Sequence, residues 1–259
     1  MKLATWNVNS LSVRLPQLLA WLSAQQPDAL VLQETKLTDD RFPVDELRAA
    51  GYHSAFFGQK TYNGVALLTR DSLDEPQGVV RGIPNYADAQ ARVIAGTVGA
   101  LRVVGAYFPN GQAPGTDKFD YKLQWMRALR DWLNDELMQH PQLVLMGDYN
   151  VAPEDRDVYD PVAWKDQIHC TVEERDAFRK LTELGLRDAF RLFEQPDKSW
   201  SWWDYRNLAF RKNQGLRIDH ILVSTPLVPH VVSCVIDKAP RKNERPSDHA
   251  PVIADIALA

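Results

Sequence analysis

Carboxylate and amide side chains recur where hydrophobic segments of this sequence end. Asn7 closes the first segment, Glu34 follows the second, Asp148 and Asn150 follow a later one, and Asp248 stands just before the last. Each residue alone is compatible with an ordinary cap or turn. Together, without cysteine pairs or a histidine cluster, they favour Mg²⁺ or Mn²⁺ over structural zinc. Such a cation, an oriented water and charge-stabilising groups are sufficient for phosphodiester hydrolysis.

A further acid lies inside an apolar run rather than at its end. Asp219 follows Ile218 and precedes Ile221 by two positions. A carboxylate buried in such a run needs a hydrogen-bonding or charged partner. A histidine is a natural partner, and the sequence offers two candidates, His220 and His249.

The elements that must position these residues are read from hydrophobic periodicity. Leucines at i, i+3, i+4 and i+7 predict a helix over 15–22 with Pro16 in its first turn, and a longer apolar stripe predicts a helix over 119–137. Strands and helices mix without strict alternation, which favours a layered α/β sandwich with hairpins over a doubly wound fold. The predicted strands are 2–8, 29–32, 64–69, 93–98, 101–107, 143–146, 216–223, 231–236 and 252–256.

Length and composition predict one domain over residues 1–259, because 45% hydrophobic residues can fill a sizeable core and no linker or repeat is visible. No apolar run approaches the roughly 18 residues of a membrane span, and the start turns polar too early for a secretory leader. Cys170 and Cys234 have neither metal nor redox spacing. We therefore expect a cytoplasmic monomer with free thiols and no membrane partner.

The charge distribution is uneven. The net charge of −4 argues against a polyanionic ligand, but residues 206–245 carry eight basic and three acidic side chains, +8 − 3 = +5, which leaves −9 elsewhere. A local basic surface suits a phosphate backbone. A solvated basic face without a partner is the alternative, and charge alone favours it. The bases are Arg206, Arg211, Lys212, Arg217, Lys238, Arg241, Lys242 and Arg245.

Eight short motifs, taken in order, resemble the exonuclease III family, within the superfamily that also contains DNase I-like nucleases and inositol-phosphate phosphatases. They extend from residue 5 to residue 251, nearly the whole chain. The motifs are TWNVNS (5–10), LQETK (32–36), YNGVA (62–66), AYFPNG (106–111), GDYN (147–150), SWWDYR (201–206), GLRIDH (215–220) and PSDHAP (246–251).

The resemblance implies an α/β fold of four layers, DNase I-like, in which two packed, mainly antiparallel sheets are flanked by helices and the site lies at one end. It also implies a Mg²⁺-dependent DNA-repair enzyme, with Mn²⁺ as a substitute. Its substrate would be duplex DNA with 3′ ends, nicks or abasic sites. The expected activities are 3′–5′ exonuclease, 3′-phosphatase and incision 5′ of abasic sites.

Metal-binding roles carry over onto matching positions. Glu34, with Asn7 and Asp248 nearby, resembles the metal-binding set, and Asp148 and Asn150 are further candidate ligands. Which acid binds metal and which serves the water stays open, because one or two metals can bind.

Catalytic roles carry over in the same way. Asp148 resembles the residue that positions or deprotonates the attacking water. Asn150 and His249 resemble the groups that hydrogen-bond the scissile phosphate, with Asp219 orienting His249. A carboxylate on one ring nitrogen favours the charged imidazole, which can then donate to phosphate. Tyr107 resembles the family's active-site tyrosine.

Substrate-binding positions follow the same resemblance. Trp202, Trp203 and Leu216 match the pocket for a flipped-out abasic sugar, where an apolar slot would reject an intact nucleotide by bulk. Core packing is the alternative explanation of the tryptophan pair. Arg206 and the later bases are then candidate phosphate contacts.

The chain departs from the family pattern at two positions. Ser10 follows Asn9 where glycine is usual, which is unfavourable if the backbone there has positive φ. His169 replaces a glycine that usually precedes phenylalanine and a Thr/Pro-x-x-Glu-Arg segment; here residues 168–175 read IHCTVEER. Our hypothesis is that His169 narrows the space for a continuous strand or a flipped sugar, so that abasic-site incision is weakened while 3′-end processing survives. The alternative is that the loop shifts and both activities remain.

Two other functions are compatible with the superfamily. A phosphatase acting on phosphorylated lipid head groups is disfavoured by the tryptophan pair, by the Tyr107 segment and by the lack of a membrane-binding feature. A catalytically inactive regulator that binds nucleic acid or a partner is disfavoured because such relatives lose acids of the set, and here all are present.

Overall fold

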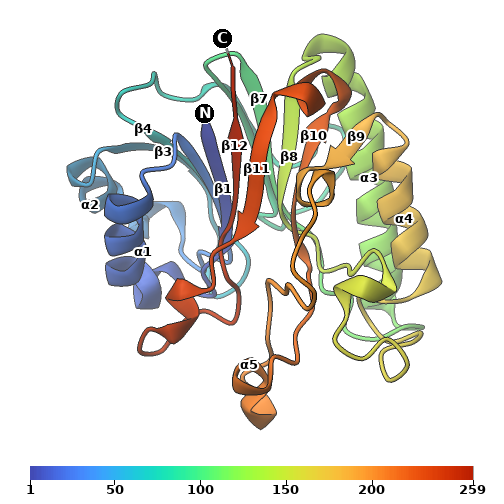
Figure 1. Cartoon of the computed structure of the whole chain (residues 1–259). Coiled ribbons are helices and arrows are strands. Elements are labelled where there is room, and N and C mark those ends of the chain that lie inside the picture. Colours follow the sequence, from blue (N-terminus) through green and yellow to red (C-terminus); the bar gives the residue numbers. More distant parts are fainter. Residues whose placement is uncertain (259) are drawn as a thin grey trace.

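The computed structural model describes residues 1–258 as two β-sheets of six strands each, with helices outside both sheets (Figure 1). The strand order is β11-β12-β1-β2-β4-β3 in the first sheet and β5-β6-β7-β8-β10-β9 in the second. In each sheet one neighbouring pair is parallel, β1–β2 and β7–β8, and the others are antiparallel. This confirms the layered sandwich expected from the sequence.

The strand bounds agree with most of the predicted runs. The first sheet contains β1 (Lys2–Asn7), β2 (Ala29–Gln33), β3 (Tyr52–Phe57), β4 (Val65–Arg70), β11 (Val231–Ile236) and β12 (Val252–Ile256). The second contains β5 (Gln77–Arg81), β6 (Val93–Val98), β7 (Leu101–Tyr107), β8 (Leu143–Asp148), β9 (Leu186–Asp188) and β10 (Asp219–Ser224).

The helices are α1 (Leu11–Gln25), α2 (Val44–Ala49), α3 (Asp117–Gln139), α4 (Val172–Thr182) and α5 (Ala209–Lys212). Short 3₁₀ turns lie at 39–41, 155–157, 189–192, 206–208, 225–230 and 239–242. The apolar face of α1 packs on the outside of the first sheet, and α3 and α4 pack on the outside of the second.

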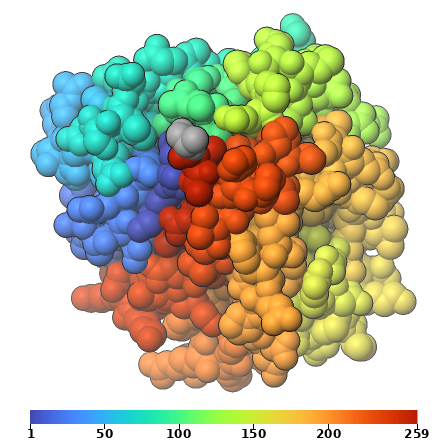
Figure 2. All heavy atoms as spheres, turned by 45° about the horizontal axis from the view of Figure 1, so that its top comes forward, coloured from blue at the N-terminus to red at the C-terminus, as the bar shows by residue number. Residues whose placement is uncertain are grey.

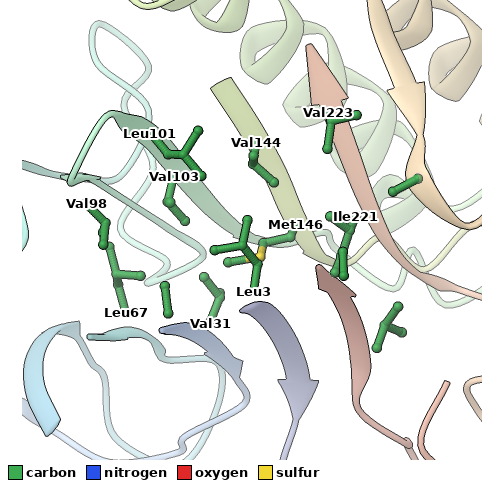
Figure 3. Close-up of a cluster of buried hydrophobic side chains, with 14 of the residues drawn as sticks. Leu3, Val31, Leu67, Val98, Leu101, Val103, Val144, Met146, Ile221 and Val223 are labelled. Carbon is green, nitrogen blue, oxygen red and sulfur yellow. The ribbon is translucent and has the colours of Figure 1, made fainter. Parts of the chain in front are cut away.

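The inner faces of the two sheets form one apolar layer (Figure 3). Leu3 and Val31 of the first sheet meet Val103 and Met146 of the second, all with no exposed surface. The sheets approach closely at Gly105, where an added Cβ would lie 2.4 Å from Val31 Cγ1. This packing fixes the ends of the strands of one sheet relative to those of the other.

Several sequence-based predictions need correction. The helix expected over 15–22 begins at Leu11, so Pro16 lies in its second turn rather than its first. Its missing N–H leaves the carbonyl of Ser12 without an intrahelical donor, which is tolerated because Ser12 is exposed to water. The strand expected over 216–223 begins at Asp219, because Leu216 makes only isolated bridges with Val158 and Trp202.

Some peripheral helices and strands were not predicted from the sequence. They include β3, β5 and β9, which lack the long apolar runs of central strands, and the helices α2, α4 and α5.

The basic segment 206–245 is less basic at the surface than its composition suggests. Arg217 is buried and paired with Asp157 and Asp188. Arg241 is buried as well and packs over the ring of Phe210. These two bases are therefore part of the interior and are unavailable to a ligand.

The two ends of the described chain lie together, at the side of the molecule opposite α5 (Figure 1). In Figure 2 the C-terminal part of the chain, in red, lies between the N-terminal part, in blue, and the segment near residue 200, in orange. Among the described residues, no helix is both long and apolar enough to cross a membrane.

Candidate active site

Strand register brings the predicted site residues to one end of the sandwich. Asp148, at the end of β8, lies opposite Tyr107 of β7 and Asp219 of β10. Asn7 ends β1, and its amide donates to Asp148 Oδ2 at 2.9 Å across the two sheets. The site is therefore built where strands of both sheets end on the same side.

His249 is the histidine that pairs with Asp219. Its Nδ1 donates to the two Asp219 oxygens at 3.0 and 2.9 Å, and its Nε2 lies 3.7 Å from Asp148 Oδ2. His220, the other candidate, faces the opposite side of β10, and its nearest charged neighbour is Arg217. Ser201 Oγ accepts from the N–H of Asp219 at 3.0 Å and fixes its backbone.

Charge states at this pair follow from burial and neighbours. Burial lowers the pKa of His249, but the carboxylates of Asp219 and Asp148 outweigh it and raise the pKa to about 10. His249 is therefore an imidazolium at neutral pH, with Nε2–H free to donate. Burial, with the nearby Asp219 charge, raises the pKa of Asp148, against the opposing effects of His249 and the Asn7 amide.

Glu34 lies on the other side of Asn7. Its Oε1 accepts from Asn7 Nδ2 at 2.9 Å and from the Tyr107 hydroxyl at 3.0 Å, and Lys36 Nζ lies 2.9 Å from its Oε2. Burial, together with Glu34 and Asp148, raises the pKa of Tyr107 well above its usual value, so the phenol remains a neutral donor. The backbone of Glu34 has φ 51°, which turns its carboxylate toward the site.

Ligand atoms of Glu34, Asp148 and His249 lie within 4.8 Å of one another. His249 is unsuited as a metal ligand here, because Nδ1 is bound to Asp219 and the ring is charged. The carboxylates of Glu34 and Asp148 supply the oxygen ligands that Mg²⁺ or Mn²⁺ prefers, and the Asn7 amide nitrogen donates to both and holds them together. The donor chemistry thus fits a hard divalent cation.

Asp248 lies at the edge of this group and is already engaged. Its Oδ1 accepts from Asn9 Nδ2 at 2.9 Å, and its Oδ2 accepts from Trp202 Nε1 at 3.0 Å. Asn9 also accepts from Lys36, so it joins the Asp248 side to the Glu34 side. Metal binding by Asp248 stays a prediction.

Asn150 follows β8 in a left-handed conformation, φ 50°. Its side-chain nitrogen donates to the carbonyl of Phe108 at 3.0 Å, and Asn110 Nδ2 lies 3.4 Å from its Oδ1. A groove of about 690 Å³ opens beside Tyr107 and Asn110 and is lined further out by Arg92 and Lys118.

The two predicted pocket tryptophans have different environments. Trp202 is partly exposed and bound to Asp248, as a substrate contact requires. Trp203 has no exposed surface and packs against Phe210 and Ala250 in a separate apolar cluster. This corrects the expectation for Trp203: core packing explains it. Leu216 is also fully buried and packs against Trp202, so it can affect the pocket only by supporting Trp202.

Arg206 and His169 are the other residues predicted to contact the substrate. The side chain of Arg206 is 83% exposed, so a phosphate can reach it, but its guanidinium is paired with Asp204. His169 is buried with φ 73°, a backbone that favours glycine. Its Nδ1 lies 2.7 Å from the carbonyl of Asn150, and its ring lies between those of Trp164 and Trp202.

Two lysines at the site, Lys36 and Lys122, were not predicted from the sequence. Lys36 follows Glu34 by two residues and pairs with its carboxylate. Lys122 is buried on the apolar face of α3, three residues after Phe119 and four before Met126. A charged residue on an apolar helical stripe is the signal that could have found it, since a buried charge requires a partner.

The chain is similar over nearly its whole length to known proteins of one family. A profile described as the Endonuclease/Exonuclease/phosphatase family matches residues 4–249. The chain belongs to that family. It is 38% identical to an exodeoxyribonuclease III of Haemophilus influenzae, over 98% of this chain and 99% of that protein. It is therefore a member of the exonuclease III type, which are hydrolases.

Solved structures of relatives have the same fold over their whole length. A 3′ phosphatase from Neisseria bound to a product DNA hairpin superposes with a TM-score of 0.97 at 47% identity, covering all of both chains. An AP endonuclease from Archaeoglobus fulgidus superposes with a TM-score of 0.95 at 35% identity, also covering all of both chains. The relatives thus include enzymes named for 3′ ends and for abasic sites.

Proposed function

We propose that the chain is a Mg²⁺-dependent phosphodiesterase that repairs 3′ ends of duplex DNA, as a 3′–5′ exonuclease and 3′-phosphatase, with Mn²⁺ as a substitute. Its substrates would be duplexes with blocked or recessed 3′ ends and nicks. The observation that carries the proposal is the charged His249, whose Nδ1 is bound to Asp219. The Nε2 of His249 faces Asp148, which lies in the same group of side chains as Glu34.

Each residue of the group has a distinct chemical role. The imidazolium of His249 donates Nε2–H to a phosphate oxygen, and Asp219 keeps it charged and aligned. Asp148 orients the attacking water, because its buried carboxylate has a raised pKa and is the stronger base. Asn150 and Tyr107 are neutral donors that would exchange their present acceptors, the Phe108 carbonyl and Glu34, for the phosphate. These are fixed dipoles and charges around a trigonal-bipyramidal phosphorus, which is how such sites stabilise developing charge.

Glu34 and Asp148, with the Asn7 amide beside them, would hold the cation, and Asn150 and Asp248 are further candidate ligands. When bound, the cation supplies positive charge that stabilises the phosphate oxygens.

The choice between DNA ends and internal sites is assigned to His169. Its ring is pinned to the Asn150 carbonyl and lies beside Trp202, so it fills space next to the phosphate-binding residue. A 3′ phosphate ends at that point, whereas an abasic strand continues past it. We therefore expect 3′-end processing to be efficient and incision at abasic sites to be weak.

Release of phosphate from a 3′-phosphorylated DNA hairpin with Mg²⁺ tests the function. We expect multiple turnovers with Mg²⁺ or Mn²⁺ and none with EDTA. His249→Asn, purified identically, is the control for contaminating nucleases. DNA binding without turnover at any metal concentration would instead indicate an inactive regulator.

His169→Gly tests the specificity on a duplex with a single abasic site. We expect incision to rise by about tenfold or more while phosphate release changes little, since glycine suits φ 73° and opens the space. Absence of a gain in incision would remove His169 as the determinant.

The free, buried thiols of Cys170 and Cys234 are compatible with a reducing compartment, and we infer a cytoplasmic monomer. Sedimentation of the purified chain with and without DNA tests the monomeric state.

A further inference from the structure

A buried ion pair lies directly beneath the site and takes no part in the chemistry described above. Lys122 of α3 and Glu174 of α4 both have fully buried side chains and form a salt bridge. Burial lowers the pKa of Lys122, and the charge of Glu174 opposes that effect. A pair of charges so completely removed from water is costly unless further hydrogen bonds satisfy it.

The further bonds of Lys122 all go to backbone of site loops. Its Nζ donates to the carbonyl of Asn150 at 2.7 Å and to the carbonyl of Asn110 at 3.2 Å. These are the two asparagines whose side chains meet next to the scissile position. One ammonium group therefore joins the loop after β7 to the loop after β8.

Glu174 adds the third loop. Its Oε1 accepts from the backbone N–H of His169 at 3.0 Å, and its Oε2 accepts from the N–H and hydroxyl of Thr171 at 3.1 and 2.8 Å. Glu174 is thus the capping-box residue of α4 and at the same time the partner of Lys122. The next residue, Arg175, donates to the carbonyl of Ala152 at 3.1 Å and holds the same loop from outside.

The loops held in this way have backbones that are unfavourable by themselves. Asn150 has φ 50° and His169 has φ 73°, both in the left-handed region. Such conformations cost on the order of 1–3 kcal/mol and persist where the surroundings impose them. The Lys122–Glu174 pair contacts the main chain at both residues, so it is placed to impose them.

We propose that Lys122 and Glu174 are positioning residues for phosphate hydrolysis: the buried pair locks the main chain of Asn110, Asn150 and His169 into one arrangement, and so controls turnover at the site. This inference rests on the proposed function for its catalytic readout. Its structural consequence, loss of order in these three loops, does not depend on any activity.

The test compares two double variants that each remove one buried ion pair. Lys122→Met/Glu174→Leu removes both charges together, so no lone charge is left buried. Arg102→Met/Glu136→Leu is the matched control, because that pair is also nearly buried, with a 2.6 Å contact, and joins β7 to α3 away from the site. Both proteins are measured with the 3′-phosphorylated hairpin and Mg²⁺.

We expect kcat of the Lys122/Glu174 variant to fall by about 100-fold, with KM changed less than about threefold, because misplacement of catalytic groups by an ångström has effects of that size. The Arg102/Glu136 variant should keep kcat within about twofold of the parent. Retention of kcat by a folded Lys122/Glu174 variant, or equal losses in the two variants, would overturn the proposal.

Hydrogen exchange provides the readout without DNA or metal. The N–H of Ala152 donates to the carbonyl of His169 at 2.8 Å and reports on the join between two of the loops. We expect it to exchange about tenfold faster in the Lys122/Glu174 variant and at the parent's rate in the control. Unchanged exchange would refute the positioning role even if the parent showed no hydrolysis, whereas an inactive parent would refute the proposed function alone.

Glu174→Gln keeps the side-chain volume and serves if the double variant does not fold. It should shift both readouts in the same direction by about threefold or more, since a hydrogen bond to a charged group is roughly twice as strong as a neutral one. No change in either readout in this variant would also refute the proposal.

Discussion

Two adjacent residues of β10, Asp219 and His220, face opposite sides of their sheet and lie in opposite electrostatic environments. On the site side, Asp219 and Asp148 raise the pKa of His249 to about 10. On the helix side, burial and then Arg217 lower the pKa of His220 to about 4. Both histidines are buried to a similar degree.

The partner, rather than burial, therefore decides which imidazole is charged. His220 is held as a neutral ring, with Nε2–H donating to the Val151 carbonyl at 2.9 Å and Nδ1 accepting from Arg217 at 2.9 Å. Both ring nitrogens of His220 are therefore committed to structural hydrogen bonds. His249 uses only Nδ1 for structure, so Nε2–H remains available for a substrate. The difference between the two histidines is that His249 keeps one ring N–H free for a substrate and His220 does not.

The largest effect is expected from Asp219→Asn, which removes the charge that keeps His249 protonated. Phosphate release from the 3′-phosphorylated hairpin should fall by about 100- to 1000-fold, the range for losing one aligned donor to a transition state. KM should change little. A variant with more than a tenth of the parent's kcat would show that the charge of His249 is unimportant.

On the other side of β10, Arg217→Met should act on stability. It leaves Asp188 without its cation and leaves Asp157 with Arg191 alone, which costs about 3–5 kcal/mol. Urea unfolding monitored by tryptophan fluorescence measures this loss, and kcat per folded molecule should be unchanged. A loss below about 1 kcal/mol would contradict the view that this network is structural.

His220 and His249 should have opposite effects on the way stability changes with pH. His220 has a folded-state pKa of about 4, below its unfolded value, so the unfolded chain takes up the proton first and stability falls as pH drops from about 6.5 toward 4. His169, whose pKa burial and Lys122 also lower to about 4, adds to this loss.

His249 acts in the opposite direction. Its folded-state pKa is raised to about 10, so its contribution is complete below about pH 6.5 and is lost as pH rises toward 10. Urea midpoints across pH 4–10 test both slopes. His220→Asn should flatten the acid limb by roughly 3 kcal/mol and His249→Asn the alkaline limb by roughly 5 kcal/mol. If His220→Asn instead flattened the alkaline limb and His249→Asn the acid limb, the charge states assigned to the two histidines would be reversed.

The smallest effect is expected from Ser201→Ala. Ser201 Oγ accepts from the N–H groups of Ile218 and Asp219, both at 3.0 Å, and its loss leaves two buried donors unsatisfied. Stability should fall by about 1–3 kcal/mol, and kcat by about tenfold or less through Asp219. Loss of stability with no change in kcat would show that strand packing alone aligns Asp219.

The main part of the fold was predictable because central strands carry long apolar runs. The runs at 29–32, 93–98 and 143–146 all lie within observed strands, since both faces of these strands are buried. The edge strand β5 is mostly exposed and has no such run. Its pairing with β6 is decided by tertiary contacts, which local sequence does not encode.

The apolar pattern predicted the composition of the site and left the partner of Asp219 open, whereas the family resemblance paired Asp219 with His249. Position at strand ends identified Asn7, Glu34 and Asp148, while the choice between His220 and His249 depended on the face of β10, a property of register. Trp202 and Trp203 are adjacent in sequence, yet one lies at the pocket and the other in the core. Only the structure separates two such neighbours, because alternation assigns faces without saying which face meets the site.

The place of β12 in its sheet has a consequence for biosynthesis. This strand lies between β1 and the edge strand β11, so β11 has no partner in the first sheet until residues 252–256 have been made. The site spans Asn7 to His249 and is likewise incomplete until His249 has been made. Contacts between such distant segments form late in folding. A ribosome-bound partial chain therefore has no assembled centre, and cleavage activity begins only after translation has passed the last strand.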